Sequence, residues 1–357
     1  MKQNIKLKSQ DANMLLWLPS PMGDAVMCTP ALRAIRKHFK SGKITFIAKS
    51  VVRQVLSPCS FNDDWIEYKN NNPFTIAKEL KKHEFTHAVL FKNSFASAFA
   101  VRFAGIPNRV GYSRENRGFF LTDKLYPEKL DNGKYKPNSM VDYYLAVASR
   151  LGADITNRHL ELSVNPQDKF ALLEKLPELA KTSRPIIIFV PGGAFGPSKL
   201  WPAAKFVQAA DKLMEEYNAT IVISVAYTEA EKQIAKEICN SSKYSQPDNK
   251  TGGRLISLAD RYVSLGELKP LFSMADLVIT NDTGPRHIAV ALQRNVITLF
   301  GPSNPAWTDT GYEKEIKIIS NIDCAPCHKK VCPKENQCMT GIAVEEVLAA
   351  ADKFLKK

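Results

Sequence analysis

The sequence predicts two α/β domains, each a doubly wound parallel sheet with helices on both faces, which together enclose a cleft. Apolar segments of strand length alternate with helical patterns in both halves of the chain, as is typical of parallel sheets. With 357 residues, the chain is too long for one ordinary hydrophobic core. Its composition, 45% hydrophobic and 24% charged, is that of an ordinary globular protein.

The first half of the chain contains three apolar segments of strand length, with helical patterns between them. The expected strands are "MLLWLP" (14–19), "KITFIAK" (43–49) and "THAVLF" (86–91), and the expected helices are 29–40 and 94–105. The segment "IPNRVGYSRENRG" (106–118), rich in turn residues and basic residues, is expected to be a loop.

The second half repeats this alternation. The expected strands are 184–193, 219–226, 254–258, 276–280 and 295–301, and the expected helices are 203–216, 229–239, 265–275, one that begins at Pro285, and 343–356. The charged segment 162–185, interrupted by prolines, is predicted to connect the domains. The predicted division is 1–170, 171–342 and a C-terminal helix 343–357 that packs back on the N-terminal domain.

The net charge is +13, from 49 basic and 36 acidic residues, and it favours anionic partners. Lysines are scattered along the whole chain, so a solvated surface explains part of this excess, and no aromatic-basic motif indicates nucleic acid. No apolar segment is long enough to span a bilayer, and the N-terminus lacks the pattern of a secretory signal. We expect a cytoplasmic monomer.

The first candidate site is "ITNDTGPRHIAVALQ" (279–293), where a strand leads into a helix. A helix N-terminus attracts anions, and Gly284 lets a ligand approach the backbone. Thr283 and His287 could contact a phosphate, whereas Asp282 suits a sugar hydroxyl. The alternative is that Asp282 or Thr283 only caps the helix.

The second candidate is "VPGGAFGPSKLWP" (190–202), which follows a buried strand. Its glycines and Lys199 suggest a loop that wraps a phosphate. The segment matches neither a Walker A loop nor a Gly-x-Gly-x-x-Gly dinucleotide loop. A plain turn is the alternative.

The third candidate is "LPSPMGDAVMCTPAL" (18–32), in which Asp24 lies at the start of a helix and could accept a proton from a hydroxyl nucleophile. A capping aspartate is the alternative. Together the three segments suit transfer of a group from a diphosphate donor to a hydroxyl acceptor. No Asp-x-Asp motif is present to hold a metal–diphosphate pair.

Four of the seven cysteines, Cys324, Cys327, Cys332 and Cys338, lie in "CAPCHKKVCPKENQC". This spacing is compatible with a structural zinc ion, although reduced thiols in a cytosolic protein are often only thiols.

Four segments, "PSPMGDAVMCTPALRAIRKHF", "FKNSFASAFAVRFAGIPNRVGYSRENRG", "PGGAFGPSKLWP" and "NDTGPRHIAVAL…TLFGPSNP", resemble, in this order, bacterial lipopolysaccharide heptosyltransferases of glycosyltransferase family 9. The likeness is to the heptosyltransferase II type and spans nearly the whole chain. It implies a GT-B fold and inverting transfer of heptose from ADP-L-glycero-D-manno-heptose, without a required cofactor. The implied acceptor is a heptose of the lipid A–Kdo–heptose inner core, at the cytoplasmic face of the inner membrane. The resemblance also implies that the protein is peripherally associated with this membrane.

The resemblance also implies roles for residues. Asp24 matches the general base of the family and Lys199 its diphosphate-binding lysine. The implied donor-binding residues are Gly193, Ala194, Phe195, Gly196, Lys199, Ser264, Asp282, Thr283, Gly284 and His287, with Ser264 near the nucleoside. The implied acceptor-binding residues are Met22, Gly23, Asn93, Arg114 and Arg117, although loop arginines are usually only solvated.

Three alternatives stay open. A related family 9 transferase with another donor or acceptor would share these motifs. A non-catalytic two-domain protein that binds an anion would give no reason for Asp24. A nicotinamide oxidoreductase is disfavoured because the glycine fingerprint is missing.

Overall fold

The computed structural model describes residues 12–182, 185–245 and 255–356, which form two compact units. The first unit comprises residues up to Leu162 together with Ala306–Gly311, and the second comprises Ser163–Pro305 and Tyr312 onward. The start of the chain (1–11), residues 183–184 of the predicted connection and Arg254 of a predicted strand lie outside the described residues. Within the described ranges no helix is long and apolar enough to cross a membrane.

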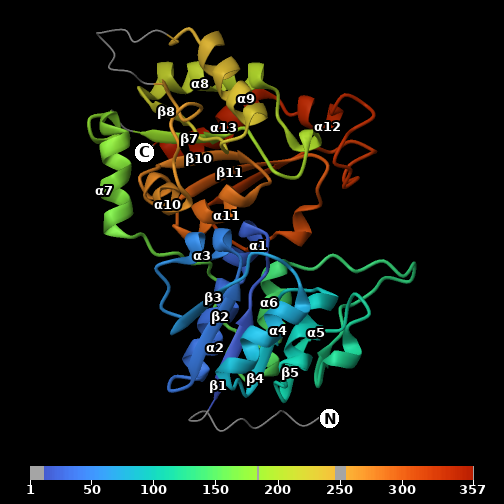
Figure 1. Ribbon diagram of the computed structural model, residues 1–357. Helices are drawn as coiled ribbons and strands as arrows, with labels where there is room; N and C mark the ends of the chain where they lie inside the picture. Colours follow the sequence, from blue (N-terminus) through green and yellow to red (C-terminus); the bar gives the residue numbers. More distant parts are fainter. Residues whose placement is uncertain (1–11, 183–184, 246–254, 357) are drawn as a thin grey trace. The chain divides into compact units, whose positions relative to one another are not determined.

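The first unit contains a parallel sheet of six strands in the order β3-β2-β1-β4-β5-β6 (Figure 1). Its strands are β1 (Asn13–Trp17), β2 (Lys43–Ala48), β3 (Asp64–Glu67), β4 (His87–Leu90), β5 (Asn108–Tyr112) and β6 (Asp123–Leu125). Its helices are α1 (Met22–Met27), α2 (Thr29–His38), α3 (Ser50–Leu56), α4 (Pro73–Leu80), α5 (Phe95–Phe103) and α6 (Met140–Arg150), with the 3₁₀ turns η1 (Lys81–His83) and η2 (Gly118–Phe120).

The second unit repeats this architecture with strand order β12-β11-β10-β7-β8-β9. Its strands are β7 (Ile186–Val190), β8 (Thr220–Ile223), β9 (Leu255–Ser257), β10 (Leu277–Asn281), β11 (Asn295–Phe300) and β12 (Glu315–Ile319). Its helices are α7 (Pro166–Lys175), α8 (Ala203–Tyr217), α9 (Glu229–Ser241), α10 (Leu265–Ser273), α11 (Gly284–Ala291), α12 (Gln337–Thr340) and α13 (Val344–Leu355), with η3 (Pro177–Ala180) and η4 (Pro197–Lys199) as 3₁₀ turns. The 3₁₀ turn η5 (Pro305–Trp307) begins in the second unit and ends in the return segment that belongs to the first.

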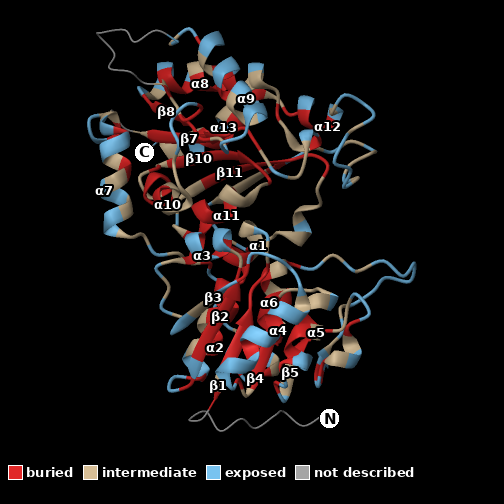
Figure 2. Cartoon of the chain, in the orientation of Figure 1, coloured by how far each residue is buried: buried red, intermediate tan, exposed pale blue. Residues whose placement is uncertain are grey.

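The cores lie between the sheets and their helices, and the central strands are buried along their length (Figure 2). β7 reads Ile-Ile-Ile-Phe-Val because a parallel strand covered on both faces has no solvated side. Each unit has the doubly wound order in which the chain reverses direction between two central strands, β1 and β4 in the first unit and β7 and β10 in the second. Ligands bind beyond the carboxyl ends of the strands at such a switch point.

The sequence predictions need three corrections. Residues 106–118 contain the strand β5 as well as a loop, and the predicted connection 162–185 contains the helix α7. The C-terminal helix α13 packs against α8, β11 and β12 within the second unit, so its expected packing on the N-terminal domain was wrong. The reason is its apolar stripe, which includes Val347 and Ala351 and belongs to the core of the second unit.

Candidate functional site

Two segments meet at the switch point of the second unit, where β7 and β10 are paired neighbours. β7 leads into the glycine-rich loop 191–199, and β10 leads into the turn before α11. Asn281, the last residue of β10, joins them, since its amide nitrogen donates to the carbonyl of Pro191 at 2.7 Å. The two candidate loops of the second unit therefore form one site.

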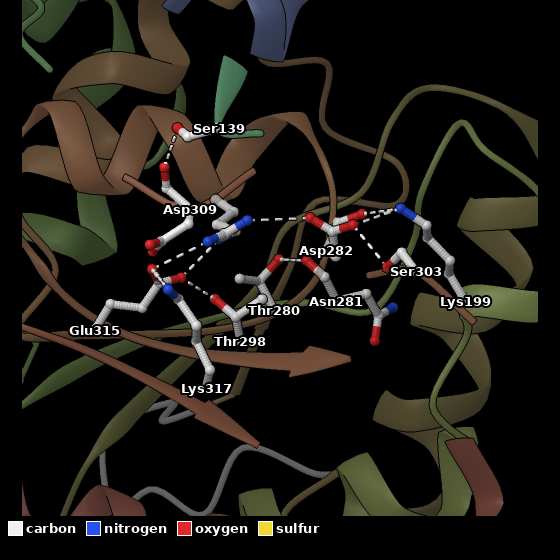
Figure 3. A network of polar contacts seen from close by, with 11 residues as sticks. Ser139, Lys199, Thr280, Asn281, Asp282, Thr298, Ser303, Asp309, Glu315 and Lys317 are labelled. Atoms are coloured by element: carbon white, nitrogen blue, oxygen red, sulfur yellow. Dashed lines mark hydrogen bonds and ion pairs between the residues drawn. The ribbon is translucent and has the colours of Figure 1, made fainter. Parts of the chain in front are cut away.

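Lys199 and Asp282 form a close ion pair in this site (Figure 3). The Lys199 ammonium lies 2.6 Å from Asp282 Oδ2 and 3.0 Å from the Asp282 carbonyl oxygen. Ser303 also donates to the Asp282 carboxylate, at 2.8 Å. Burial alone would raise the pKa of Asp282, but Lys199 and Arg286 outweigh it and hold this pKa well below its ordinary value. Asp282 is therefore an anion that positions the lysine, a role that the sequence did not predict.

Arg286 on α11 is fully buried, and its guanidinium donates hydrogen bonds to two carboxylates. It donates to Asp282 at 3.1 Å and, through two nitrogens, to Glu315 at 2.6 and 3.0 Å. Thr298 on β11 also donates to Glu315, at 2.6 Å. Because a buried charge needs a partner, this chain of ions fixes the turn on the edge strand β12. The sequence did not predict that Arg286 pairs with Glu315, since 29 residues separate them.

The N-terminus of α11 carries no side-chain cap. The Thr283 side chain makes no capping hydrogen bond, and the Asp282 carboxylate is held by Lys199, Ser303 and Arg286. The capping alternative is therefore wrong for Thr283. An uncapped helix N-terminus leaves the positive end of its dipole for an anion. Gly193 lies beside it, because a Cβ on that glycine would lie 3.6 Å from Thr283 Oγ1.

His287 is buried one turn into α11 and is neutral at physiological pH. Burial, together with the charge of Arg286, lowers the pKa of His287 to about 3. Its Nδ1 atom is buried and has no hydrogen-bond partner among the described residues. A buried nitrogen without a partner is rare in folded proteins, and a bound ligand is one way in which it is satisfied.

The glycine-rich loop is held by Glu231 on α9, a residue absent from the sequence predictions. Its carboxylate accepts hydrogen bonds from the backbone N–H groups of Gly193 at 3.2 Å and Ala226 at 2.7 Å. A Cβ at Gly192 would lie 2.1 Å from Glu231 Oε2, so a larger residue there would displace this carboxylate from the loop. Gly196 has a φ of 147° and lies against Lys330, so it too has no room for a side chain. Phe195 covers the Lys199 ammonium with its ring, 4.7 Å away.

Ser264 has a structural role at the start of α10. Its hydroxyl accepts from the Glu267 N–H at 3.3 Å, and the Glu267 carboxylate accepts from the Ser264 N–H at 2.8 Å, which together form a capping box. Lys175 pairs with Glu267 at 2.6 Å. The predicted role of Ser264 near a nucleoside therefore gains no support from its side-chain contacts.

In the first unit, Asp24 is the third residue of α1 and follows β1 at the switch point. Its half-buried carboxylate makes no hydrogen bond or ion pair with the residues that the structure describes, and the helix start at Pro21 has no side-chain cap. Burial raises the pKa of Asp24 from 3.8 to about 6. A carboxylate that is neither a cap nor an ion-pair partner, with a pKa near neutrality, suits a general base.

The first unit also contains a polar cluster that the sequence did not reveal, formed by Lys92, Tyr68 and Ser20. Lys92 follows β4 and donates to the Tyr68 hydroxyl at 2.8 Å, while Ser20, which follows β1, lies 3.4 Å from the same oxygen. Burial raises the pKa of Tyr68, but these hydrogen bonds outweigh it and leave this pKa below its ordinary value. The signal available in the sequence was the position of Lys92 directly after a predicted strand.

Arg117 is fully buried, so its predicted contact with an acceptor was wrong. Its guanidinium donates to the carbonyls of Tyr112 and Lys92 and to the side chain of Asn93. The Asn93 amide in turn donates to the Tyr143 hydroxyl at 2.9 Å. Arg117 and Asn93 therefore position other residues, because their polar atoms are engaged within the protein.

Arg114 instead lines a pocket of about 450 Å³ that lies wholly in the first unit. Its guanidinium lies over the ring of Tyr135, 4.2 Å from the centroid, and its Nε atom is buried without a hydrogen-bond partner in the described ranges. Tyr112 and Tyr143 stack at 3.7 Å between centroids on another wall, and Trp307 completes it. Aromatic faces with one guanidinium suit a sugar ring that carries an acidic group.

The four clustered cysteines are free thiols. Cys338 lies on α12 and is buried in the core of the second unit, whereas Cys324, Cys327 and Cys332 lie half-buried in the preceding loop. Burial, followed by the nearby thiols, raises the pKa of Cys338. Across residues 12–182, 185–245 and 255–356, no three metal-binding side chains are grouped to hold an ion, so the spacing alone suggested zinc.

Sequence comparison identifies relatives along nearly the whole chain. Residues 74–338 match the model of glycosyltransferase family 9 (heptosyltransferase). The chain is 25% identical to lipooligosaccharide heptosyltransferase 2 of Campylobacter jejuni over 349 residues, covering 96% of this chain and 98% of that protein. It is 27% identical to lipopolysaccharide heptosyltransferase 2 of Escherichia coli over 307 residues, covering 81% and 83%.

Solved structures show the same architecture. ADP-heptose LPS heptosyltransferase II of Escherichia coli superposes with a TM-score of 0.75 at 25% identity, covering 96% of this chain and 98% of that one. A family 9 glycosyl transferase from Veillonella parvula has the same fold, with a TM-score of 0.80 at 20% identity and coverage of 97% and 98%. The predicted GT-B fold is confirmed, and the chain belongs to glycosyltransferase family 9, the heptosyltransferases.

Proposed function

We propose that this heptosyltransferase moves heptose from ADP-L-glycero-D-manno-heptose to a heptose hydroxyl of the lipopolysaccharide inner core, with inversion at the anomeric carbon. The relatives named above are lipooligosaccharide and lipopolysaccharide heptosyltransferases. The observation that carries the donor half of the proposal is the uncapped N-terminus of α11 beside Lys199, at the switch point of the second sheet.

In this mechanism the oxygen of the acceptor hydroxyl attacks the anomeric carbon, and Asp24 accepts the proton of that hydroxyl. The bond from that carbon to the diphosphate oxygen breaks, and ADP leaves with the electron pair. Lys199 and the dipole of α11 stabilise the charge on the departing diphosphate, the task that a metal ion performs in many other transferases.

The direct test is a panel of nucleotide sugars incubated with truncated lipopolysaccharide acceptors. We expect ADP release only with ADP-heptose and a heptose-bearing acceptor, and we expect chelators to leave the rate unchanged. Release from another sugar nucleotide would indicate a family 9 transferase of different specificity. Binding of ADP-heptose with no release, whatever the acceptor, would indicate a non-catalytic protein.

Replacing Glu231 with alanine should weaken binding of the donor about tenfold or more, because two loop N–H groups lose a charged acceptor worth about 1.5–3 kcal/mol each. Titration calorimetry with ADP would measure this change. Glu229→Ala is the matched control, since Glu229 lies on the same helix and pairs only at the surface with Lys232. Equal ADP affinity in the Glu231 and Glu229 variants would show that the glycine-rich loop does not contact the donor.

We assign the Arg114 pocket to the acceptor. Arg114→Ala should raise the KM for a lipopolysaccharide acceptor about tenfold, the effect of losing one charge-assisted hydrogen bond, and leave the KM for the donor unchanged. Steady-state kinetics with each substrate varied in turn would separate the two. Arg53→Ala is the control, because Arg53 is exposed and pairs with Glu67 at the surface. An unchanged acceptor KM would place the acceptor elsewhere.

A further inference from the structure

The surface of the first unit carries a cluster of six phenylalanine rings, which we call the phenylalanine patch. Four of its members are unusually exposed, with 65% of Phe74, 46% of Phe95, 56% of Phe103 and 67% of Phe119 accessible to solvent. Phe99 and Phe120 complete it. Each ring contacts at least one other, at centroid distances between 4.0 and 6.2 Å.

The patch arises because α5 is apolar on both sides. Phe95, Phe99 and Phe103 recur at intervals of four and so form one stripe along the helix. The opposite side holds small residues, among them Ala98 and Val101, which pack into the core of the first unit. An ordinary surface helix turns its large apolar residues inward, whereas α5 turns them outward, and a helix that is apolar all round is normally covered.

Neighbouring elements extend the stripe into a surface. α4 packs beside α5 and contributes Phe74, whose ring lies 5.0 Å from that of Phe99. The 3₁₀ turn η2 contributes Phe119 and Phe120, with Phe120 lying 5.6 Å from Phe99. Contiguous exposed apolar surface of this kind marks an interaction site.

Basic residues outnumber acidic ones on the elements that carry the rings. α4, α5 and η2 hold Lys78 and Arg102 against one acidic residue, Glu79, which is paired with Lys82 of the adjoining turn η1. Lys78 lies one turn after Phe74 on α4, and Arg102 lies one turn after Phe99 on α5, so each cation is on the same helix face as a ring of the patch. These three basic side chains are exposed.

We propose that the phenylalanine patch docks the enzyme on an anionic lipid bilayer, with the rings inserted at the interface and the cations against the headgroups. Aromatic insertion and a cluster of basic residues are the two signals that together give stable attachment to a membrane surface. The choice of a bilayer over a protein partner rests on this one-sided charge and on the proposed function, since a lipid-linked acceptor lies at a membrane.

The test is co-sedimentation of the full chain with vesicles of phosphatidylethanolamine and phosphatidylglycerol at three to one, and with phosphatidylcholine vesicles. We expect binding to the anionic vesicles that weakens with salt and is much weaker to phosphatidylcholine. Phe95→Ser combined with Phe103→Ser and Phe119→Ser should lower the partition coefficient at least about tenfold, as should Lys78→Glu with Arg102→Glu. Phe170→Ser is the matched control, because Phe170 is 66% exposed on α7 in the second unit.

The assay contains neither donor nor acceptor, so it reports on docking even if the proposed transferase activity is wrong. The charge-reversal variant keeps every ring, so it still tests the surface if the serine variant fails to fold. Wild-type protein that ignores anionic vesicles, or patch variants that bind as well as Phe170→Ser, would overturn the proposal. A dimer in sedimentation that the serine substitutions dissociate would instead assign the patch to a second copy of the chain.

Discussion

Replacing Asp24 with asparagine should lower turnover about 10²–10⁴-fold, the usual contribution of a general base, and leave the affinity for ADP-heptose nearly intact. Asparagine has the shape of aspartate but cannot accept the hydroxyl proton. In the wild-type enzyme, kcat/KM should fall as the pH drops below about 6, because burial raises the pKa of Asp24 to about 6 and protonation removes the base. Rapid-quench turnover and a pH–rate profile would measure both effects.

The same substitution should stabilise the fold. Because the pKa of Asp24 is higher in the folded protein than its ordinary 3.8, the native state binds this proton more tightly, and stability is lost as the pH rises from about 4 to about 6. At pH 7 the ionised Asp24 lowers the free energy of unfolding by at most about 3 kcal/mol, the value that corresponds to a pKa shift from 3.8 to about 6. The half-buried side chain keeps the loss below this limit. Asp24→Asn should therefore melt at a higher temperature than the wild type at pH 7, with little difference at pH 4.

Asp142→Asn is the control for both measurements. Asp142 lies on α6 in the same unit and pairs with Arg158 at the surface. It should change turnover little and should not raise the melting temperature at pH 7. If Asp24→Asn kept wild-type turnover, another group would have to accept the proton, and the mechanism would be wrong.

Replacing Lys199 with alanine should lower turnover about 10²–10³-fold, the range found when one charge-stabilising donor is removed from a transition state. It should also weaken the binding of ADP more than that of AMP, because the ammonium is placed to contact the diphosphate. The loss leaves Asp282 with fewer cationic partners beside that phosphate, which adds repulsion. Titration calorimetry with both nucleotides and single-turnover kinetics would separate binding from departure of the leaving group.

Lys236→Ala serves as the matched control, since Lys236 lies on α9 in the same unit and pairs with Asp260 at the surface. Its affinity for ADP and its turnover should equal those of the wild type. A Lys199 variant that binds ADP and AMP as the wild type does would exclude the lysine from the diphosphate site.

The central strands were predictable because strands buried on both faces are unbroken apolar runs, as in Ile186–Val190. The strands missed lie toward the edges of the sheets. β3 reads Asp-Trp-Ile-Glu and β12 reads Glu-Ile-Lys-Ile-Ile, and a charged, half-exposed strand resembles a loop when only one sequence is available.

The location of the candidate site was predictable for the same reason, since turns after buried strands could be found by their composition. Its internal contacts were not. The pairing of Arg286 with Glu315 depends on β11 lying beside β12, which the sequence does not reveal. Arg117 and Arg114 lie three residues apart in one basic segment, and only the fold shows that one is buried and the other lines a pocket.

The path of the chain between the two units limits how the enzyme can be divided into fragments. The chain enters the second unit after Leu162, returns to the first for Ala306–Gly311, and then leaves it again at Tyr312. Asp309 in this return segment accepts a hydrogen bond from Ser139, and Trp307 forms part of the pocket wall. A fragment that stops at residue 162 would lack these contacts, so exchanging acceptor halves between relatives requires grafting two separate pieces of chain.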